Sequence, residues 1–408
     1  MSKNRYAVLI FCSLSALYFF SILHRVGVAV IALDIMNEFR TDASLLGLMS
    51  SMYFFPYAVA QIPVGIMLDR IGIRKTVSML SLVACVGSIL FSLSPSIEVL
   101  TLGRAMVGFG VGGFYVSSLK AIAVWFKPGR FATLTGVLTA IGNIGGLVAS
   151  SPLALLSLAL GWRYSFLLIS FFMLLFTGVA WFVIKEEDAS SFRSQGSIMC
   201  DLRTVFSKGD FLKLTLVPLF VYGYFISFQG LWGGPFLMDV YGMSKPTAGN
   251  FLLFIALGFM IFLPIAGFIS DKIQRRKPVL ITGILLSLLF WGIMYAAGRS
   301  MGAYELMSML FLLGTSFGFS NIYMTVSKEL FTTDICGTAM ACYNTFAFIG
   351  AGFFQYFMGF LLDITYGGTR IFASYQLIFL IGVVLIALSL IVAILSKETF
   401  SAAPVCPT

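Results

Sequence analysis

The chain is dominated by apolar runs of about 20 residues, each long enough to cross the hydrocarbon core of a bilayer as an α-helix. Apolar residues make up 59% of the 408 residues and charged residues only 11%, against roughly 45–50% and about 25% in soluble domains. So few charged side chains cannot cover a surface that faces water, whereas the 42 phenylalanines suit a surface that faces lipid. We therefore expect an all-α integral membrane protein embedded in the lipid bilayer.

The apolar runs form two groups of six, separated by the longest polar stretch of the chain. That stretch runs from Lys185 to Lys213 and holds five acidic and five basic residues. The expected spans are 6–33, 45–68, 77–93, 99–126, 131–158 and 164–184, then 211–237, 247–270, 279–297, 304–327, 337–362 and 371–395. This predicts twelve transmembrane helices in an N-terminal bundle (1–184), a cytoplasmic linker (185–210), a C-terminal bundle (211–396) and a cytoplasmic tail (397–408).

The short loops predict the orientation of the spans. Basic clusters lie in the loops 69–75, 127–130 and 271–277, whereas the first opposite loop, 34–42, is net acidic. Lys and Arg favour the cytoplasmic side, and all three basic loops share a side with both termini. We therefore expect both termini in the cytoplasm, and we place the protein in a bacterial inner membrane. The formal charge of +9 is then a topology signal, and we expect no nucleic-acid partner.

The two halves of the chain repeat each other. The segment that begins at Gly65 recurs at Gly267, 202 residues later. Farther on, Gly113-Phe114, Phe126, Thr133 and Gly145 recur 205 residues later as Gly318-Phe319, Phe331, Thr338 and Gly350. Two six-helix repeats in tandem are typical of transporters that rock about a site near the bilayer midplane.

The repeated loop resembles the best-known motif of the major facilitator superfamily, Gly-x-x-x-Asp-Arg-x-Gly-x-Arg-Lys, and the resemblance covers nearly the whole chain. The first copy matches at Gly65, Asp69, Arg70, Gly72, Arg74 and Lys75. The second keeps Gly267, Asp271, Arg276 and Lys277, with Lys272 in place of Arg, Gln274 in place of Gly, and Arg275 at a variable position of the motif. The resemblance implies the major facilitator fold: two pseudo-symmetric six-helix bundles that work by alternating access.

The physical interpretation of the motif loops is a gate. Gly65 would permit close helix contact, and Asp69 would face a helix N-terminus and neighbouring Arg side chains. Such a cytoplasmic latch would form in the outward-open state and break in the inward-open one. The alternative is that these charges only anchor the topology.

The first span resembles the anion:cation symporter group within the superfamily. Its residues His24-Arg25-Val26 stand where that group often has Asp-Arg-Val. The resemblance implies that Arg25 contacts the substrate and that His24, in the place of the Asp, carries a coupling proton. Val111, seven residues after Arg104, stands where some members have a second titratable acid, so neither of the group's usual carboxylates occupies its position here.

Ionisable side chains deep in the spans are expensive and mark functional sites. Four lie well inside: His24, Arg25, Arg104 and Lys120, all in the N-terminal half. A cavity with fixed cations and no deep carboxylate suits an anionic substrate. Each also has a structural alternative, since Arg104 can satisfy unwound backbone carbonyls, Lys120 can extend to the headgroups, and His24 can serve as a helix-contact residue.

Polar and aromatic residues complete the predicted substrate site. Tyr53 and Tyr57 flank Pro56 in span two. The C-terminal half offers Gln229 and Trp232 in span seven, Asn321 in span ten, and Asn344 and Gln355 in span eleven. Such residues also form hydrogen bonds between helices, so each has a structural alternative.

These features predict a secondary active transporter for a small organic anion of the sugar-acid, carboxylate or phosphate-ester type, coupled to protons. The sequence has no Gly-rich ATP loop, metal-spaced His/Cys set or nucleophile elbow. We therefore expect a monomer without cofactor, metal or enzyme activity. Proton-driven export of amphiphilic compounds is an alternative, weakened by Asn143, where drug:proton antiporters usually have Pro. Amino-acid or peptide transport, and a non-transporting receptor or membrane enzyme, are further alternatives.

Overall fold

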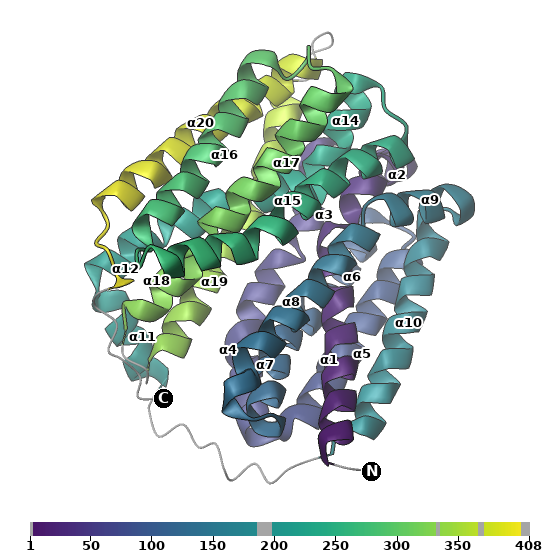
Figure 1. Cartoon of the computed structure of the whole chain (residues 1–408). Helices are drawn as coiled ribbons and strands as arrows, with labels where there is room; N and C mark the ends of the chain where they lie inside the picture. The colour runs from purple at the N-terminus through teal and green to yellow at the C-terminus, as the bar shows by residue number, and fades with distance from the viewer. Residues whose placement is uncertain (1–2, 186–197, 332–334, 366–370, 401–408) are drawn as a thin grey trace. The chain divides into compact units, whose positions relative to one another are not determined.

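The computed structural model describes residues 3–185, 198–331, 335–365 and 371–400 (Figure 1). All the regular elements in these ranges are helices. Residues 186–197 of the expected linker and 401–408 of the expected tail lie outside the described residues. The later part of the expected linker contains a helix, α11 (Ile198–Ser207).

Eleven helices of the described residues are long and apolar enough to cross a membrane. A twelfth span is the pair Thr133–Val148 and Ser151–Leu160, which is bent by 42°. The bend coincides with Pro152 at the start of the second helix, where a residue without an N–H is tolerated. The predicted all-α membrane fold is therefore confirmed, with twelve spans when the bent pair is counted as one.

The chain divides into two compact units, Met1–Ser194 with Ser244–Gly249, and Gln195–Met243 with Asn250–Thr408. The helices of the first part of the chain are α1 (Lys3–Val26), α2 (Val28–Phe39), α3 (Ala43–Ser51), α4 (Phe54–Arg70), α5 (Gly72–Ser92), α6 (Ile97–Val111), α7 (Phe114–Trp125), α8 (Phe131–Val148), α9 (Ser151–Leu160) and α10 (Trp162–Val183). Several predicted single spans are thus two helices joined at a break, as in α1–α2, α3–α4 and α6–α7.

The second part of the chain has a similar order of helices but does not repeat every break. After α11 come α12 (Gly209–Leu214), α13 (Gly223–Ser227), α14 (Gly233–Tyr241), α15 (Lys245–Lys272), α16 (Lys277–Ala297), α17 (Ala303–Ser320), α18 (Tyr323–Glu329), α19 (Cys336–Thr365) and α20 (Ile371–Leu395). Two π-helical turns, Pro218–Tyr222 and Phe228–Trp232, flank α13. Such turns are rare and often accompany functional sites.

Glycines let neighbouring helices touch through their backbones at matching places in the two units. A methyl group at Gly145 would overlap the carbonyl of Phe19, and one at Gly350 would overlap the carbonyl of Leu219. Because no other residue fits such an approach, these glycines fix how α8 packs on α1 and how α19 packs on the span that contains α13. The internal repeat therefore extends from the sequence to the helix packing.

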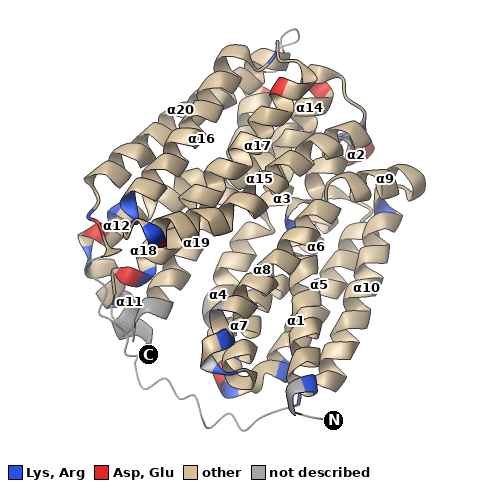
Figure 2. Cartoon of the chain, in the orientation of Figure 1, with Lys and Arg blue, Asp and Glu red and all other residues tan. Residues whose placement is uncertain are grey.

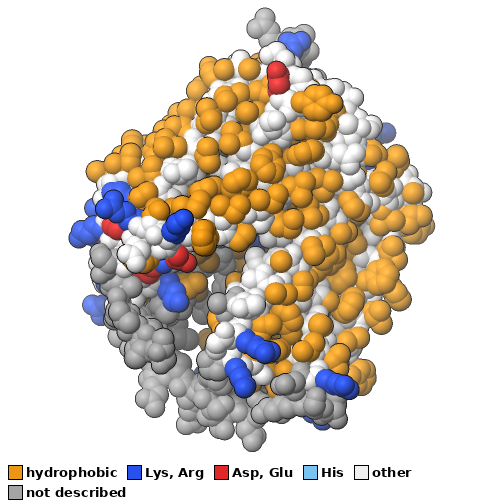
Figure 3. Space-filling model, viewed as in Figure 1, with side chains coloured by type: hydrophobic (Ala, Val, Ile, Leu, Met, Phe, Trp, Pro, Cys, Tyr) orange, Lys and Arg blue, Asp and Glu red, His pale blue; other side chains and the backbone are white. Residues whose placement is uncertain are grey.

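Charge and hydrophobic surface are separated in both units. In each unit Lys and Arg gather at one end of the helices, near α4 and α7 in the first and near α12 and α18 in the second (Figure 2). Hydrophobic side chains cover the sides of the helices (Figure 3). Phe182 and Phe268, for example, are 82% and 68% exposed. Such surfaces are stable in lipid and not in water.

Candidate functional site

The first unit contains a buried arginine whose guanidinium is only partly satisfied. Arg104 lies on α6, is 1% exposed, and stacks 4.8 Å above the ring of Tyr53. One nitrogen donates to the carbonyl of His24 over 2.7 Å, but Nε and the other terminal nitrogen have no hydrogen-bond partner among the described residues. One nitrogen of Arg104 therefore binds a backbone carbonyl, as the structural alternative for this residue expects. The other two nitrogens are not explained by that role.

Aromatic rings connect Arg104 to a second arginine. Tyr53 stacks on Tyr57 with the ring centroids 6.1 Å apart, and Arg25 lies 5.6 Å from the ring of Tyr57. The Tyr53 hydroxyl donates to the carbonyl of Ser21, which ties α1 to the start of α4. The structure therefore brings together Arg25, Arg104 and Tyr57, three of the residues predicted to bind substrate, with Tyr53 between them. We call Arg25, Arg104, Tyr53 and Tyr57 the arginine–tyrosine cluster.

His24 lies beside this cluster but is bound to other helices. Its imidazole is 1% exposed and packs 5.6 Å from the ring of Phe166 on α10. Nε2 lies 3.3 Å from the Ser88 hydroxyl on α5, which also accepts a hydrogen bond from Ser170 over 2.6 Å. The His24 backbone binds Arg104 while its ring contacts two hydroxyl-bearing helices, so His24 links the cluster to the rest of the unit.

Lys120 belongs to a different part of the unit. Its Nζ donates over 2.7 Å both to Asp69 Oδ1 and to the carbonyl of Leu68. The structure therefore groups Lys120 with the first motif loop, residues 65–75, rather than with the arginine–tyrosine cluster. The sequence offered Lys120 as a substrate ligand and Asp69 as a latch, and gave no sign that the two form a pair.

The glycines of the motif loops have a different role from the one expected for Gly65. A methyl group at Gly65 or at Gly267 would meet no atom within 4 Å, so neither glycine packs closely against another helix of its own unit in this structure. Gly72 instead has φ +81°, where side chains are disfavoured. Its counterpart Gln274 adopts the same left-handed region with φ +53°. The motif therefore preserves a backbone turn, even where Gln replaces Gly.

The second motif loop, residues 267–277, is built around Arg276. This guanidinium binds Asp271 over 2.5 Å and Glu329 of α18 over 2.9 Å. It also stacks 4.9 Å from the ring of Phe400. The carboxylate of Glu398 accepts hydrogen bonds from the backbone N–H groups of Arg276 and Lys277. Residues 398–400, near the C-terminus, thus pack against the second motif loop.

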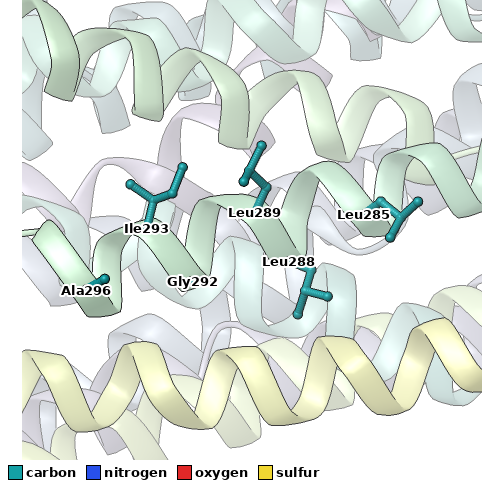
Figure 4. A pocket seen from close by; sticks show the side chains of 6 residues that line it. All are labelled: Leu285, Leu288, Leu289, Gly292, Ile293 and Ala296. Atoms are coloured by element: carbon teal, nitrogen blue, oxygen red, sulfur yellow. The ribbon is translucent and has the colours of Figure 1, made fainter.

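The predicted polar residues of the second unit do not form one cluster. Gln229, Asn321 and Asn344 are half-buried, and no hydrogen bond joins them within the part of the chain that the structure describes. Trp232 is buried and donates from its indole to the carbonyl of Gln355 over 2.9 Å. A hollow on this unit is lined by apolar residues of α16 alone, so it offers a substrate no polar side chain (Figure 4).

Comparison with known proteins decides the family. The model of the Major Facilitator Superfamily matches residues 9–354. The chain belongs to the major facilitator superfamily. This confirms the predicted family and fold, and makes the protein a multi-pass membrane transporter rather than an enzyme. Among the described residues, no three His, Cys, Asp or Glu side chains lie together as metal ligands would.

Several members of the major facilitator superfamily are similar to this chain along most of its length. A probable sulfoacetate transporter of Cupriavidus necator is 25% identical over 334 residues, covering 76% of each chain. A hexuronate transporter of Bacillus subtilis is 24% identical over 406 residues, covering 92% of this chain and 94% of the relative. A solved bacterial homologue of the human lysosomal transporter Spinster, 17% identical, matches 99% of both chains with a TM-score of 0.82 and shows the shared fold.

Proposed function

We propose that the protein transports a small organic anion, of the sugar-acid, carboxylate or phosphate-ester type, by alternating access. The observation that carries this proposal is the unsatisfied guanidinium of Arg104. A buried donor without a partner costs about 1–3 kcal/mol, and more when it is charged. Two such donors on one cation are stabilised when a carboxylate, sulfonate or phosphate binds them, because a planar guanidinium holds two oxygens of such groups at once.

The neighbours of Arg104 support an anion as the substrate. Arg25 adds a second positive charge 5.6 Å from Tyr57, and the two tyrosine rings supply π faces that stabilise both guanidinium groups. The relatives support the same class, because sulfoacetate and hexuronates are organic anions. Export of amphiphilic compounds has no comparable group in the described residues of the first unit, whereas an amino acid would bind the same arginines through its carboxylate.

A binding assay tests the substrate class. Purified protein is screened by thermal shift against sugar acids, carboxylates, phosphate esters, amino acids and amphiphilic drugs, and we expect stabilisation by organic anions only. Arg104→Gln should abolish that stabilisation, and Arg25→Lys should weaken it because an ammonium lacks the bidentate geometry. Arg163→Lys is the matched control, since Arg163 pairs with Glu38 outside the cluster. Stabilisation by drugs alone would favour the exporter.

We further propose that transport is coupled to protons through His24. Imidazole titrates near neutral pH, and an arriving anion beside the two arginines favours its protonated form. Uptake into proteoliposomes should rise as the external pH falls from about 7.5 to about 5.5. His24→Gln should flatten this dependence and keep substrate exchange. If the mutant retains the full pH dependence of uptake, His24 is a structural residue that contacts Ser88 and Phe166.

The orientation is also a proposal. With both termini and the linker in the cytoplasm of a bacterial inner membrane, the two motif loops face the cytoplasm. Cysteine introduced at Ile73 or at Gln274, in a background without the native cysteines, should react with a permeant reagent and resist an impermeant one in intact cells. Reaction of either position with the impermeant reagent would reverse the topology.

A further inference from the structure

The His24 ring lies at the end of a chain of two serine hydroxyls inside the first unit. Ser170 on α10 donates to Ser88 Oγ on α5 over 2.6 Å and shares its hydrogen with the Phe166 carbonyl, 2.7 Å away. Ser88 Oγ in turn lies 3.3 Å from His24 Nε2. All three polar side chains are buried, with exposed fractions of 0% to 1%. Buried polar groups need partners within the protein, and these three groups supply them to one another.

Counting hydrogens along this chain determines which nitrogen of the neutral ring carries one. A hydroxyl donates one hydrogen bond and accepts two. Because Ser88 accepts from Ser170, its own hydrogen can point at the ring, and His24 Nε2 is then the acceptor. The bond made by one ring nitrogen decides where the hydrogen of a neutral imidazole lies. The geometry therefore favours the tautomer of His24 that has its hydrogen on Nδ1.

The same two serines can also hold the protonated ring. A histidine cation donates from both nitrogens, and Ser88 Oγ has a second acceptor site for a hydrogen on Nε2. Ser88 then turns its own hydrogen toward a carbonyl of α5, as serines in helices do. Ser92, one turn along α5, already donates to the Ser88 carbonyl in this way over 2.7 Å. Ser88 can thus change from donor to acceptor by rotation of one hydrogen.

The charges around His24 are cationic. Arg104 on α6 donates to the His24 carbonyl over 2.7 Å, and Arg25 follows in the sequence. The other charged residues of the helices packed around His24 are paired elsewhere or lie in the first turn of their helix: Lys3, Arg5, Asp34, Glu38, Arg74, Lys75, Glu98, Lys120 and Arg163. An anion bound to the arginines favours the protonated ring, and Ser88 is the group placed to hold the added hydrogen.

We propose that Ser88, oriented by Ser170, fixes the tautomer of His24 and makes Nε2 the atom that takes up the coupling proton. The proton adds to the lone pair of Nε2, and Ser88 turns its hydrogen away and accepts from the new N–H. Ser88 and Ser170 are positioning residues, since they act through His24. Their role in transport rests on the proposed coupling through His24, whereas the tautomer can be measured without transport.

The tautomer is measured by NMR. His24 is the only histidine of the chain, so protein made with isotope-labelled histidine, and purified through a tag without histidine, reports this ring alone. At about pH 8, where imidazole is neutral, we expect Nε2 without a hydrogen; it is recognised because Cδ2 is bonded to Nε2 and not to Nδ1. Ser88→Ala should shift the ratio of tautomers toward Nε2–H about fivefold, equivalent to a hydrogen bond of about 1 kcal/mol.

Matched serine variants separate this role from helix packing. Ser92→Ala removes an equally buried hydroxyl of α5 that donates to a backbone carbonyl, so the tautomer ratio should stay at the wild-type value. Ser165 donates to the Gly161 carbonyl over 2.8 Å, and Ser165→Ala is the same control for Ser170→Ala on α10. Ser88→Cys is close to serine in size and donates weakly, so its ratio should lie between those of Ser88 and Ser88→Ala.

Two results would overturn the inference. One is a wild-type ring with its hydrogen on Nε2. The other is a Ser88→Ala variant whose melting temperature falls while its tautomer ratio stays the same, since Ser88 would then only join helices.

Uptake of glucuronate into proteoliposomes tests the role in transport. The pH of half-maximal uptake should fall by about one unit in Ser88→Ala, which is a tenfold loss of proton affinity, because a hydrogen bond to a charged ring is stronger than one to a neutral ring. Ser170→Ala should lower it by less, because Ser88 keeps its hydroxyl. Ser92→Ala should keep the wild-type curve.

The outcomes distinguish this inference from the proposed function. If wild-type uptake does not depend on pH, the coupling through His24 fails, and the role of Ser88 in transport fails with it. If His24→Gln flattens the pH dependence but Ser88→Ala keeps both the wild-type curve and the wild-type tautomer ratio, the inference is wrong and the coupling through His24 stands.

Discussion

In the first unit Asp69 is held by Lys120 from α7, whereas in the second unit Asp271 is held by Arg276 from its own loop. The repeat explains how this difference arises. The position that corresponds to Lys120, 205 residues later, is Thr325, and Glu329 corresponds to Val124. Both units thus recruit a partner from the corresponding helix, α7 or α18, but the first takes a cation from it and the second an anion.

The two loops also differ in how many groups hold them. The pair in the first unit is partly exposed, with 20% of the Lys120 side chain and 47% of the Asp69 side chain open. In the second unit, Asp271 is 69% exposed, but Arg276 and Glu329 are only 11% and 12% exposed and gain Thr399 and Phe400 as further contacts. The comparison teaches that the motif preserves the path of the loop, while the strength of its attachment is set by residues outside the motif.

The largest expected effect is at Arg276. Arg276→Gln leaves the buried Glu329 carboxylate with Thr399 alone, and breaking a buried pair in this way costs about 3–5 kcal/mol. The matched variant is Arg74→Gln, since Arg74 stacks on Trp181 and should cost about 1 kcal/mol or less. Thermal unfolding in detergent measures both. Equal losses of stability would show that the two loops are attached equally.

A smaller effect is expected in the first unit, on transport. Asp69→Asn and Lys120→Gln should each slow transport by up to about fivefold, since a partly exposed ion pair contributes about 0.2–1 kcal/mol and 1.36 kcal/mol is tenfold in rate. The double variant should be no slower than either single one. Additive slowing in proteoliposome uptake would mean that the two residues act separately, and normal rates would leave the loop as a topology anchor.

The C-terminal segment should stay bound across physiological pH. Although burial acts to raise the pKa of Glu398, hydrogen bonds from the backbone N–H groups of residues 276, 277, 400 and 399 outweigh it and hold the pKa below its usual value. The stabilisation is thus complete above the pKa of a free glutamate, about 4.3, and is lost only as the pH falls through the lower folded-state pKa.

Cysteine labelling measures this. Thr399 is 2% exposed, so Thr399→Cys in a background without the native cysteines should label slowly at every pH from about 7.5 to about 5. Adding Glu398→Gln should speed labelling severalfold over that whole range. Release of the wild-type segment between pH 6 and 5 would assign its attachment to another titrating group.

The smallest effect concerns the left-handed turn. Gly72→Gln should destabilise the first unit by about 1 kcal/mol, the cost of a side chain in that region. Gln274→Gly should change the second unit by less than about 0.5 kcal/mol, since relief of strain is offset by the greater freedom of unfolded glycine. Melting temperatures of the two variants give the comparison, and a large gain from Gln274→Gly would reveal more strain than φ +53° implies.

The sequence predicted the features that depend on periodicity and repetition. The spans, the two motif loops and the cluster of Arg25, Arg104 and Tyr57 all follow from apolar runs, repeats and deep charges. The pair of Lys120 and Asp69 could not be predicted, because 51 residues separate them and many basic residues lie within reach of a loop carboxylate. That the buried side-chain amide of Gln355 has no hydrogen-bond partner among the described residues could not be predicted either, because hydrogen bonding between helices depends on rotation angles that a single sequence does not determine.

The glycine contacts between α1 and α8, and between the α13 span and α19, join helices that are synthesised at different times. Gly145 follows Phe19 by 126 residues, and Gly350 follows Leu219 by 131. At 5–20 residues per second, the earlier helix of each pair waits roughly 6 to 26 s for its partner to emerge from the ribosome. The α13 span waits as a neutral helix from 218 to 232. The first span waits with the charged side chain of Arg25 in the last turn of α1, and a charge within the membrane is costly, so assembly depends on the first helix staying in the membrane during this interval.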